Sequence, residues 1–322
     1  MTDHGGNLDV AIRRFGGRLE DWIDLSTGIN RQPYPVGELP PRAWAALPSH
    51  AEIESLHEVA RSAYGANAPM LAVAGAQAAI QMLPQLAQPG RARILAPTYN
   101  EYAPVLAAAG WQIEEAGDLD ALAGADLAVV VNPNNPDGRQ HDPKCVLALA
   151  SQVKRLVVDE SFADAMPGVS LAAEAGRPGL LILRSFSKFY GLAGLRLGFV
   201  IGCETDVAAL AAIAGPWPIS GAAIEIGRRA LLDRAWADAT RVRLAHDAGR
   251  FDTLAQSASW RLIGGTPLFR LYEIGDAAVA QERLARAKIW SRIFDGKPKW
   301  LRLGLPGDET EWARLAAALS AR

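Results

Sequence analysis

A series of short, continuously apolar segments in the middle of the chain constrains its fold most. They contain β-branched residues without polar alternation, as expected for strands buried on both faces of a sheet. They are Arg93–Ala96, Leu127–Val131, Leu156–Val158, Leu180–Leu183 and Leu197–Ile201. Helical patterns lie between them, at Glu101–Ala109 and Pro143–Val153. This alternation predicts an α/β fold with a mostly parallel sheet.

The last third of the chain follows a different pattern. At roughly 150 residues per domain, 322 residues predict about two domains. After a break at Gly215–Pro218, the sequence predicts one long helix and then a mixture of short strands and helices: Ala222–Ser257, Leu268–Tyr272, Ala277–Ala287, Ile289–Phe294, Trp300–Leu305 and a final helix. We therefore expect a large domain over 45–215, a smaller α+β domain over 216–322, and an N-terminal arm, 1–44, that belongs with the small domain.

Composition excludes several classes of protein. Half of the residues are hydrophobic and 21% are charged, so the chain can bury a substantial core. The 33 basic and 35 acidic residues are mixed along the chain and give a net charge of −2. This balance offers no basic footprint for nucleic acid or for an anionic membrane surface. An anionic substrate would therefore need a local cluster of arginines.

The cysteines and the apolar stretches indicate a soluble cytoplasmic protein. Cys145 and Cys203 are too few and too far apart for a disulfide framework or a Cys-x-x-Cys metal site. Met1–Gly6 has no basic segment followed by an apolar core, so we expect no signal peptide. Prolines, glycines or glutamines interrupt both long uncharged stretches, Ser62–Gly90 and Val207–Ile224, so neither predicts a membrane span.

Three of the predicted strands run into polar clusters, where open α/β sheets bind their ligands. The clusters are Asn132–Gly138, Asp159–Phe162 and Arg184–Gly191. Taken singly, they could be a turn, a helix cap and a solvated surface lysine. Taken together, they supply an amide, a carboxylate and a lysine, which are the groups needed to hold pyridoxal phosphate.

The residues of these motifs and their order along the chain resemble those of the fold-type I pyridoxal-phosphate enzymes of the aspartate aminotransferase superfamily. The motifs are N-P-N-N-P-D-G at Asn132–Gly138, V-D-E at Val158–Glu160 and S-F-S-K-F-Y-G-L-A-G-L-R-L-G at Ser185–Gly198. Within this superfamily, the chain is most similar to the branches of histidinol-phosphate aminotransferase and threonine-phosphate decarboxylase. The resemblance covers nearly the whole chain, from about residue 4 to residue 305.

The resemblance implies a role for each matching residue. Lys188 would form the Schiff base with the cofactor, Asp159 would pair with the pyridine nitrogen, and Asn135 would bind the phenolic oxygen of the ring. Ser185, Ser187 and Arg196 would bind the cofactor phosphate.

Two upstream segments also match the family. Val73–Ala78 resembles the glycine turn at Gly75, where the backbone N–H groups of Ala76 and Gln77 would hold the same phosphate at a helix N-terminus. The segment Pro97-Thr98-Tyr99 would stack the ring of Tyr99 on the pyridine. A glycine before a helix and a tyrosine in a loop are commonplace, so each match alone is a weak signal.

Three small signals favour the decarboxylase branch. His4-Gly5-Gly6-Asn7, followed by Ile23–Asn30, resembles the start of the threonine-phosphate decarboxylases that serve cobalamin synthesis. Phe162 stands where aminotransferases usually carry a tyrosine. Pro216–Ser220 resembles a Pro-Trp-Ser stretch of the decarboxylases.

The expected reaction is decarboxylation of O-phospho-L-threonine to 1-amino-2-propanol O-2-phosphate. The substrate carries a carboxylate and a phosphate, which require at least two groups of donors. By resemblance, Arg302 in Trp300–Leu303 would clamp the carboxylate, for which a guanidinium fork is suited. Arg292, His4 and Asn30 would form the second group. Lys188 would return a proton to Cα.

The sequence departs from the family at two places. Asp137 replaces the threonine of the Asn-Pro-Thr-Gly pattern, which puts nearby backbone contacts in doubt. Ala46-Leu47-Pro48 replaces an Arg-Tyr-Pro segment whose tyrosine would reach a neighbouring subunit, so that contact is lost, and Tyr34 is not assigned this role. We still expect a homodimer, by resemblance alone.

Several alternatives remain open at this point. One is an aminotransferase acting on histidinol phosphate or a related amine, and another is a non-catalytic homologue that binds the cofactor. His50 and His57 with Glu54 and Glu58 could hold a metal, but a solvated helix face is the simpler interpretation. Gly191–Gly194 lacks the glycine spacing of a dinucleotide site.

Overall fold

The computed structural model describes residues 5–320, whose contacts divide the chain into two compact units. The larger unit contains 34–135 and 140–237. The smaller unit contains the described residues up to 33, the segment 136–139, and the chain from 238 onwards. The expected boundaries were 44/45 and 215/216. Residues 216–237 group with the larger unit because α9 (Gly221–Leu232) packs on α3 (His50–Tyr64).

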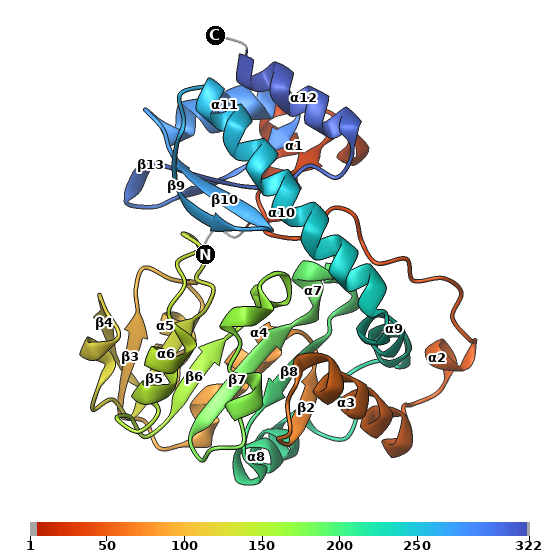
Figure 1. Ribbon diagram of the computed structural model, residues 1–322, viewed down its shortest axis with the longest axis vertical. Helices are drawn as coiled ribbons and strands as arrows, with labels where there is room; N and C mark the ends of the chain where they lie inside the picture. Colours follow the sequence, from red (N-terminus) through yellow and green to blue (C-terminus); the bar gives the residue numbers. More distant parts are fainter. Residues whose placement is uncertain (1–4, 321–322) are drawn as a thin grey trace. The chain divides into compact units, whose positions relative to one another are not determined.

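A seven-stranded sheet forms the centre of the larger unit (Figure 1). Its order is β2-β8-β7-β6-β5-β3-β4. The strands β3 to β7 pair in parallel, whereas β8 is antiparallel to both of its neighbours. The bounds are β2 Met70–Val73, β3 Arg91–Leu95, β4 Gln112–Ala116, β5 Leu127–Val131, β6 Leu156–Asp159, β7 Leu180–Ser185 and β8 Gly198–Ile201. The predicted α/β fold with a mostly parallel sheet is confirmed.

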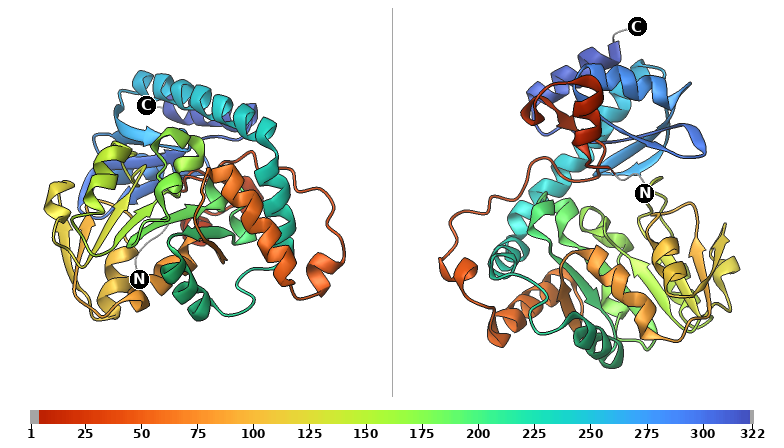
Figure 2. Two further views of the ribbon diagram at one scale, coloured as in Figure 1. Left: turned by 60° about the horizontal axis from the view of Figure 1, so that its bottom comes forward. Right: turned by 180° about the vertical axis from the view of Figure 1, so that it is seen from behind.

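Helices lie over both faces of this sheet (Figures 1 and 2). Besides α3 and α9, the helices of the larger unit are α2 Arg42–Ala45, which packs on α9, and α4 Ala76–Met82, α5 Tyr102–Ala108, α6 Pro143–Leu149, α7 Phe186–Phe189 and α8 Glu204–Ala214. Apolar residues of α4, α5 and α8 form one core with alternate residues of the strands, such as Val129, Val157 and Leu183. The same face of β6 and β7 therefore ends in Asp159 and Ser185, because strand side chains alternate between faces.

The sequence predicts one helix over Ala222–Ser257, and this prediction is wrong in one respect. The segment forms α9 and a separate helix, α10 (Arg234–Ser257). Asp233 separates them with a non-helical backbone (φ −81°, ψ 74°), and its Oδ1 accepts a hydrogen bond from the Trp236 N–H at 3.0 Å. An aspartate in this position caps a new helix and ends the previous one.

The smaller unit is built on a four-stranded antiparallel sheet of order β12-β13-β10-β9. Its strands are β9 Arg261–Thr266, β10 Phe269–Glu273, β12 Arg292–Phe294 and β13 Lys297–Gly304. A separate parallel pair joins β1 (Ile23–Asp24) to β11 (Ile289–Trp290). The expected strand region Ile289–Phe294 is thus divided between two sheets.

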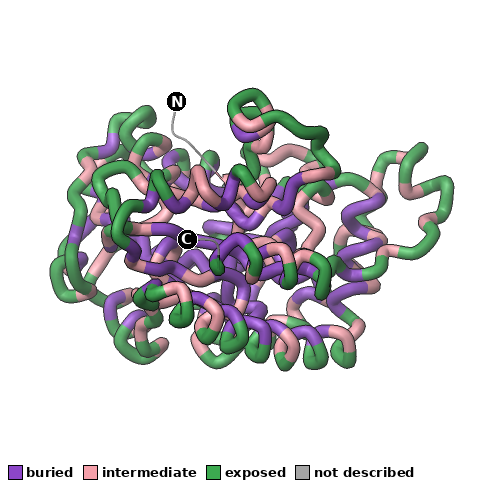
Figure 3. The backbone as a smooth tube through the Cα atoms, turned by 90° about the horizontal axis from the view of Figure 1, so that it is seen from above, coloured by how far each residue is buried: buried purple, intermediate pink, exposed green. Residues whose placement is uncertain are grey.

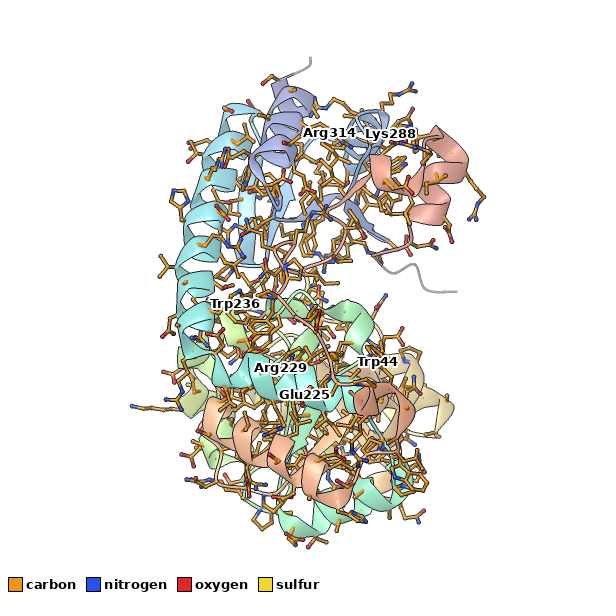
Figure 4. The ribbon with its side chains drawn as sticks, turned by 90° about the vertical axis from the view of Figure 1, so that its right-hand side faces the viewer. Trp44, Glu225, Arg229, Trp236, Lys288 and Arg314 are labelled. Atoms are coloured by element: carbon orange, nitrogen blue, oxygen red, sulfur yellow. The ribbon has the colours of Figure 1, made fainter. Side chains whose placement is uncertain are left out.

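Helices α1 (Leu8–Phe15), α11 (Ala277–Arg286) and α12 (Glu309–Ser320) complete the smaller unit, with most of α10. Two positively charged side chains labelled in Figure 4, Lys288 and Arg314, fix the N-terminal segment to the rest of the smaller unit. Lys288 Nζ donates to the carbonyls of Phe15 and Gly16, and Arg314 Nη2 donates to the carbonyl of Asp21 at 2.5 Å.

Burial follows the layers of each unit. Interior strands are buried along most of their length, while outer helices alternate between buried and exposed positions (Figure 3). Within residues 5–320, no helix is long and apolar enough to cross a membrane.

His57 corrects the expectation of a solvated histidine face on α3. Its side chain is buried, and its Nε2 accepts a hydrogen bond from the backbone N–H of Ala72 at 3.1 Å. Because β2 is the edge strand of the sheet, this histidine pairs a backbone group that has no neighbouring strand. Burial lowers the pKa of His57 below its usual value, although Glu54 opposes the shift.

Candidate active site

Asp159 ends β6 as a buried carboxylate with a donor on each oxygen. It is 3% exposed. Its Oδ1 accepts from the backbone N–H of Ser161 at 2.9 Å, and its Oδ2 accepts from the Tyr102 hydroxyl at 2.7 Å. Burial, together with the nearby Asp159 charge, raises the pKa of Tyr102 well above its ordinary value. Tyr102 therefore stays protonated and acts as the donor.

The predicted lysine lies one strand away. Ser185 ends β7, and Ser187 and Lys188 belong to the short helix α7 that follows it. Both serines are buried, whereas Lys188 is half-buried. The helix is fixed by aromatic packing: Tyr190 stacks on Phe186 with ring centroids 4.2 Å apart, and Trp236, labelled in Figure 4, stacks on Tyr190 at 5.5 Å.

Gly75 makes a tight turn into α4, and the structure shows why this position needs glycine. Its φ is +80°, and a Cβ built there would lie 2.6 Å from Nη2 of Arg196. A Cβ on Gly198 would lie 2.7 Å from the backbone nitrogen of Ala76. Since Gly198 pairs with Ser185 in the sheet, the turn, Arg196 and Ser185 share one corner of the unit.

Arg196 is exposed and adopts the left-handed conformation with φ 53°. A non-glycine residue in this region carries strain, and such strain is concentrated at functional sites. Its guanidinium donates to the carbonyl of Ala193 at 3.1 Å and, less closely, to that of Ala74 at 3.4 Å. The corner thus combines an exposed cation with the N-terminus of a helix, a donor set suited to a phosphate group.

Two loops beside Asp159 are joined by an amide that the sequence analysis did not identify. Asn134 Oδ1 accepts from the Thr98 hydroxyl at 2.6 Å, and its Nδ2 donates to the carbonyl of Pro97 at 2.9 Å. These bonds fix the loop of Tyr99 to the loop that contains Asn135. Asn135 itself is half-buried. In the sequence, the only sign of a role for Asn134 was its position next to Asn135.

The Gln77 side chain also has a role beyond its predicted backbone contact. Its Oε1 accepts from the Tyr99 hydroxyl at 3.3 Å, and its Nε2 donates to Glu101 at 2.9 Å. The glycine turn and the Tyr99 loop are therefore linked through one side chain.

A buried ion network lies on the opposite face of the same two strands. Arg184 is 3% exposed and contacts Glu160 at 2.7 Å and Asp164 at 2.5 Å. Glu160 also accepts from Ser170 and from the backbone of Leu171, each at 2.6 Å. Although burial opposes its charge, the two carboxylates raise the pKa of Arg184. The network is adjacent in sequence to Asp159 and Ser185 and ties their strands together.

The two arginines predicted to bind substrate are cross-strand neighbours in the smaller unit. Arg292 of β12 lies opposite Arg302 of β13. Like charges directly opposite each other destabilise a sheet. Arg302 is 7% exposed and donates to the carbonyl of Ser26 at 2.7 Å. Its guanidinium lies 5.3 Å from the centre of the Phe269 ring.

Asn30 is buried in the smaller unit, and its amide orientation is set by two donors. Its Oδ1 accepts from Arg243 at 2.8 Å and from the Gln32 backbone at 3.0 Å. The NH₂ end of the amide therefore points the other way, as a donor. Arg243, on α10, was not predicted, because it lies far from Asn30 in sequence. His4 lies outside the described residues.

The contacts around Asp137 belong to the smaller unit. Its Oδ1 accepts from the backbone of Arg139 at 3.0 Å. A Cβ at Gly264 would lie 2.3 Å from the Asp137 carbonyl oxygen, and one at Gly138 would lie 2.2 Å from the carbonyl carbon of Gly265. Gly138 and Gly264 thus allow this loop to pack closely against β9.

Comparison with known proteins identifies the family. The model of the class I and II aminotransferases matches residues 20–319. The chain belongs to this family. A protein of Sinorhizobium sp. named threonine-phosphate decarboxylase is 45% identical over 98% of this chain and 97% of its own length. A protein of the same name from Pseudomonas aeruginosa is 42% identical over 99% and 97%.

Comparison with solved structures shows the same fold. The histidinol-phosphate aminotransferase of Sinorhizobium meliloti, in complex with pyridoxal 5′-phosphate, superposes with a TM-score of 0.82 at 20% identity, covering 99% of this chain and 94% of that one. Within this chain, the phosphate-suited corner at Gly75 and the buried Asp159 fit such a cofactor. The described residues hold no group of three His, Cys, Asp or Glu side chains arranged for a metal ion.

Proposed function

We propose that the protein is a pyridoxal-phosphate-dependent decarboxylase of O-phospho-L-threonine, which it converts to (R)-1-amino-2-propanol O-2-phosphate for cobalamin synthesis. The observation that carries this proposal is the 45% identity, over 98% of the chain, to a threonine-phosphate decarboxylase. The similarity spans both units and therefore covers the proposed cofactor residues and the proposed substrate arginines.

The larger unit would hold the cofactor. The proposed phosphate donors are the backbone N–H groups of Ala76 and Gln77 at the Gly75 turn, with Ser185, Ser187 and Arg196. Tyr99 would lie on the ring, Asn135 would donate to its phenolic oxygen, and Asp159 would accept from its nitrogen. When bound, pyridoxal phosphate supplies an electron sink for the bond that breaks at Cα.

The smaller unit would bind the two anionic groups of the substrate. Arg302 is proposed for the carboxylate, since its buried guanidinium is held by the Ser26 carbonyl. Arg292, Asn30 and His4 are proposed for the phosphate. Holding both ends of the substrate orients the Cα–carboxylate bond, and this orientation selects decarboxylation over loss of the Cα proton.

Lys188 would manage the proton at Cα. Departure of the carboxylate as carbon dioxide leaves a carbon that must take up one proton. The Lys188 side chain, in its ammonium form, would deliver this proton from Nζ and be left as a neutral amine. Phe162, three residues after Asp159, is buried and carries no hydroxyl that could make a second polar contact to the ring.

Carbon dioxide release tests this function. Purified protein loaded with pyridoxal phosphate is given O-phospho-L-threonine without any keto acid, and release over many turnovers is expected. Lys188→Ala should abolish release, whereas the exposed α6 variant Lys144→Ala should not. Amino-group transfer to an added keto acid, without release, would instead identify an aminotransferase. Failure to bind the cofactor would identify a non-catalytic homologue.

We also propose that the protein is a homodimer. The larger unit exposes three large apolar side chains around α2 and the loop before α9: Trp44 at 71%, Leu47 at 64% and Trp217 at 54%. Figure 4 shows Trp44 on α2. A Cβ on Gly221, at the start of α9, would lie 2.6 Å from the carbonyl oxygen of Ala43, so these segments are closely packed. Exposed aromatic residues are common at protein interfaces.

A cytoplasmic location is the remaining part of the proposal. Cys145 and Cys203 are both free thiols, which suits a reducing compartment. Recovery of the protein with cytoplasmic markers on cell fractionation is expected.

A further inference from the structure

Tyr102 is a direct neighbour of Asp159 that the sequence did not predict. Its hydroxyl lies 2.7 Å from Asp159 Oδ2 and its side chain is completely buried. The Ser161 backbone holds the other oxygen. Two donors from different segments therefore determine how the carboxylate is rotated about its Cβ–Cγ bond.

The direction of the Tyr102 bond is fixed. Its hydroxyl group stays protonated, because burial raises its pKa, so it donates and Asp159 accepts. The carboxylate proposed to accept from the pyridine N–H therefore has one oxygen held by a donor of fixed direction.

Tyr102 is also placed rigidly. It is the first residue of α5, and it packs in the core beneath the sheet. Its ring meets that of Tyr99 edge-on, with centroids 6.4 Å apart. The short segment from Tyr99 to Tyr102 thus carries the proposed ring-stacking residue at one end and the hydrogen-bond donor to Asp159 at the other.

We infer that Tyr102 is a positioning residue for the cofactor: it holds the Asp159 carboxylate oriented toward the ring nitrogen. This inference rests on the proposed role of Asp159, but it does not depend on which reaction the enzyme catalyses. Without the hydroxyl group, the carboxylate would have to be ordered when the cofactor binds, and that ordering weakens binding.

Cofactor affinity in a double-mutant cycle tests the inference, independently of any substrate. The variants are Tyr102→Phe, Asp159→Asn and the two combined, and pyridoxal phosphate is titrated into each cofactor-free protein by fluorescence. Tyr102→Phe should bind about tenfold more weakly, the size expected for one hydrogen bond to a charged group. In the Asp159→Asn background the same change should have little further effect.

Tyr64→Phe is the matched control. Tyr64 is another tyrosine of the larger unit with a buried hydroxyl, but its ring lies 4.3 Å from the guanidinium of Arg184. The Tyr64→Phe variant should bind the cofactor with the affinity and the absorbance maximum of the parent protein. In Tyr102→Phe the absorbance maximum of the bound cofactor should shift. Unchanged affinity in Tyr102→Phe, or independent multiplication of the two losses, would overturn the inference. So would unfolding of cofactor-free Tyr102→Phe, because the hydroxyl would then be a structural group.

Discussion

At the scale of single residues, the proposed chemistry depends on a few side chains whose charge is managed by neighbours. Asp159 is buried with two donors, and Arg302 is buried against a backbone carbonyl and an aromatic ring. Arg292 is half-buried, its guanidinium lies 5.5 Å from the centre of the Phe294 ring, and it pairs across the sheet with Arg302. The carboxylate proposed for Arg302 and the phosphate proposed for Arg292 would offset the repulsion between the two arginines.

Replacing Arg292 with alanine should therefore impair substrate binding specifically. We expect KM for O-phospho-L-threonine to rise by about tenfold or more, the cost of losing a charged hydrogen bond. Cofactor affinity should not change, because Arg292 lies in the smaller unit. Steady-state kinetics and cofactor titration measure the two effects, with the exposed α1 variant Arg13→Ala as control. An unchanged KM would remove Arg292 from the site.

A second prediction at this scale concerns Glu160 and the free energy of unfolding. Glu160→Gln leaves the buried Arg184 with one carboxylate partner, and breaking a buried pair in this way costs about 3 kcal/mol. Urea unfolding of the two proteins measures the difference. The exposed pair of Glu174 and Arg177, 2.7 Å apart, provides the control, and Glu174→Gln should cost about 1 kcal/mol or less. Equal losses would show that the buried network does not stabilise the strands.

At the scale of elements, hydrophobic periodicity predicted the positions of most helices and strands, but it did not predict the residues at which they end. The predicted and observed strands at Leu127–Val131 coincide, because a run of β-branched residues between turns leaves little choice. The predicted helix Pro143–Val153 ends earlier, at Leu149. The break at Asp233 was missed because its capping bond to Trp236 competes with helix formation only locally.

The contact between α3 and β2 should make stability depend on pH. Burial lowers the pKa of His57 in the folded protein, while the unfolded chain keeps a value near 6.5. Neutral His57 accepts from Ala72, so its contribution is complete above pH 6.5 and is lost as pH falls below it.

His57→Gln should reduce this dependence, since glutamine can accept a hydrogen bond but does not titrate. Unfolding by urea at pH 7.5 and pH 5.5 should show a smaller loss for the variant than for the parent protein. Glu54 Oε2 lies 3.4 Å from His57 Nδ1 and opposes the lowering of its pKa, whereas Arg61 adds to it, and both act only while residue 57 is a histidine. Equal losses in both proteins would contradict the prediction.

At the scale of the whole molecule, the two units divide the proposed tasks. The proposed cofactor residues all belong to the larger unit, and the described residues proposed for substrate belong to the smaller one. The loop that carries Asn135 crosses between them, since Asn135 groups with the larger unit and Pro136 with the smaller. The departure at Asp137 is thus a matter of packing against Gly264, away from the residue that would contact the ring.

The proposed dimer is tested at this scale. Trp44→Glu combined with Trp217→Glu should weaken association by about 2 kcal/mol or more, as for buried tryptophans at other interfaces. Light scattering over a range of concentrations measures it. Val242→Glu, which changes an equally exposed apolar residue on α10, should leave the mass unchanged. A parent protein that is monomeric at all concentrations would refute the dimer.

The sequence alone determined the α/β fold and the motifs of the site, because these depend on short-range pattern: apolar strands followed by polar clusters, a glycine turn, and a lysine at fixed spacing from an arginine. Only the tertiary structure decided which side chains support them. Tyr102 meets Asp159 from 57 positions away, and Arg243 meets Asn30 from 213 positions away. No local pattern records such pairs, because they arise when helices pack against a sheet and bring a buried donor within reach of an acceptor.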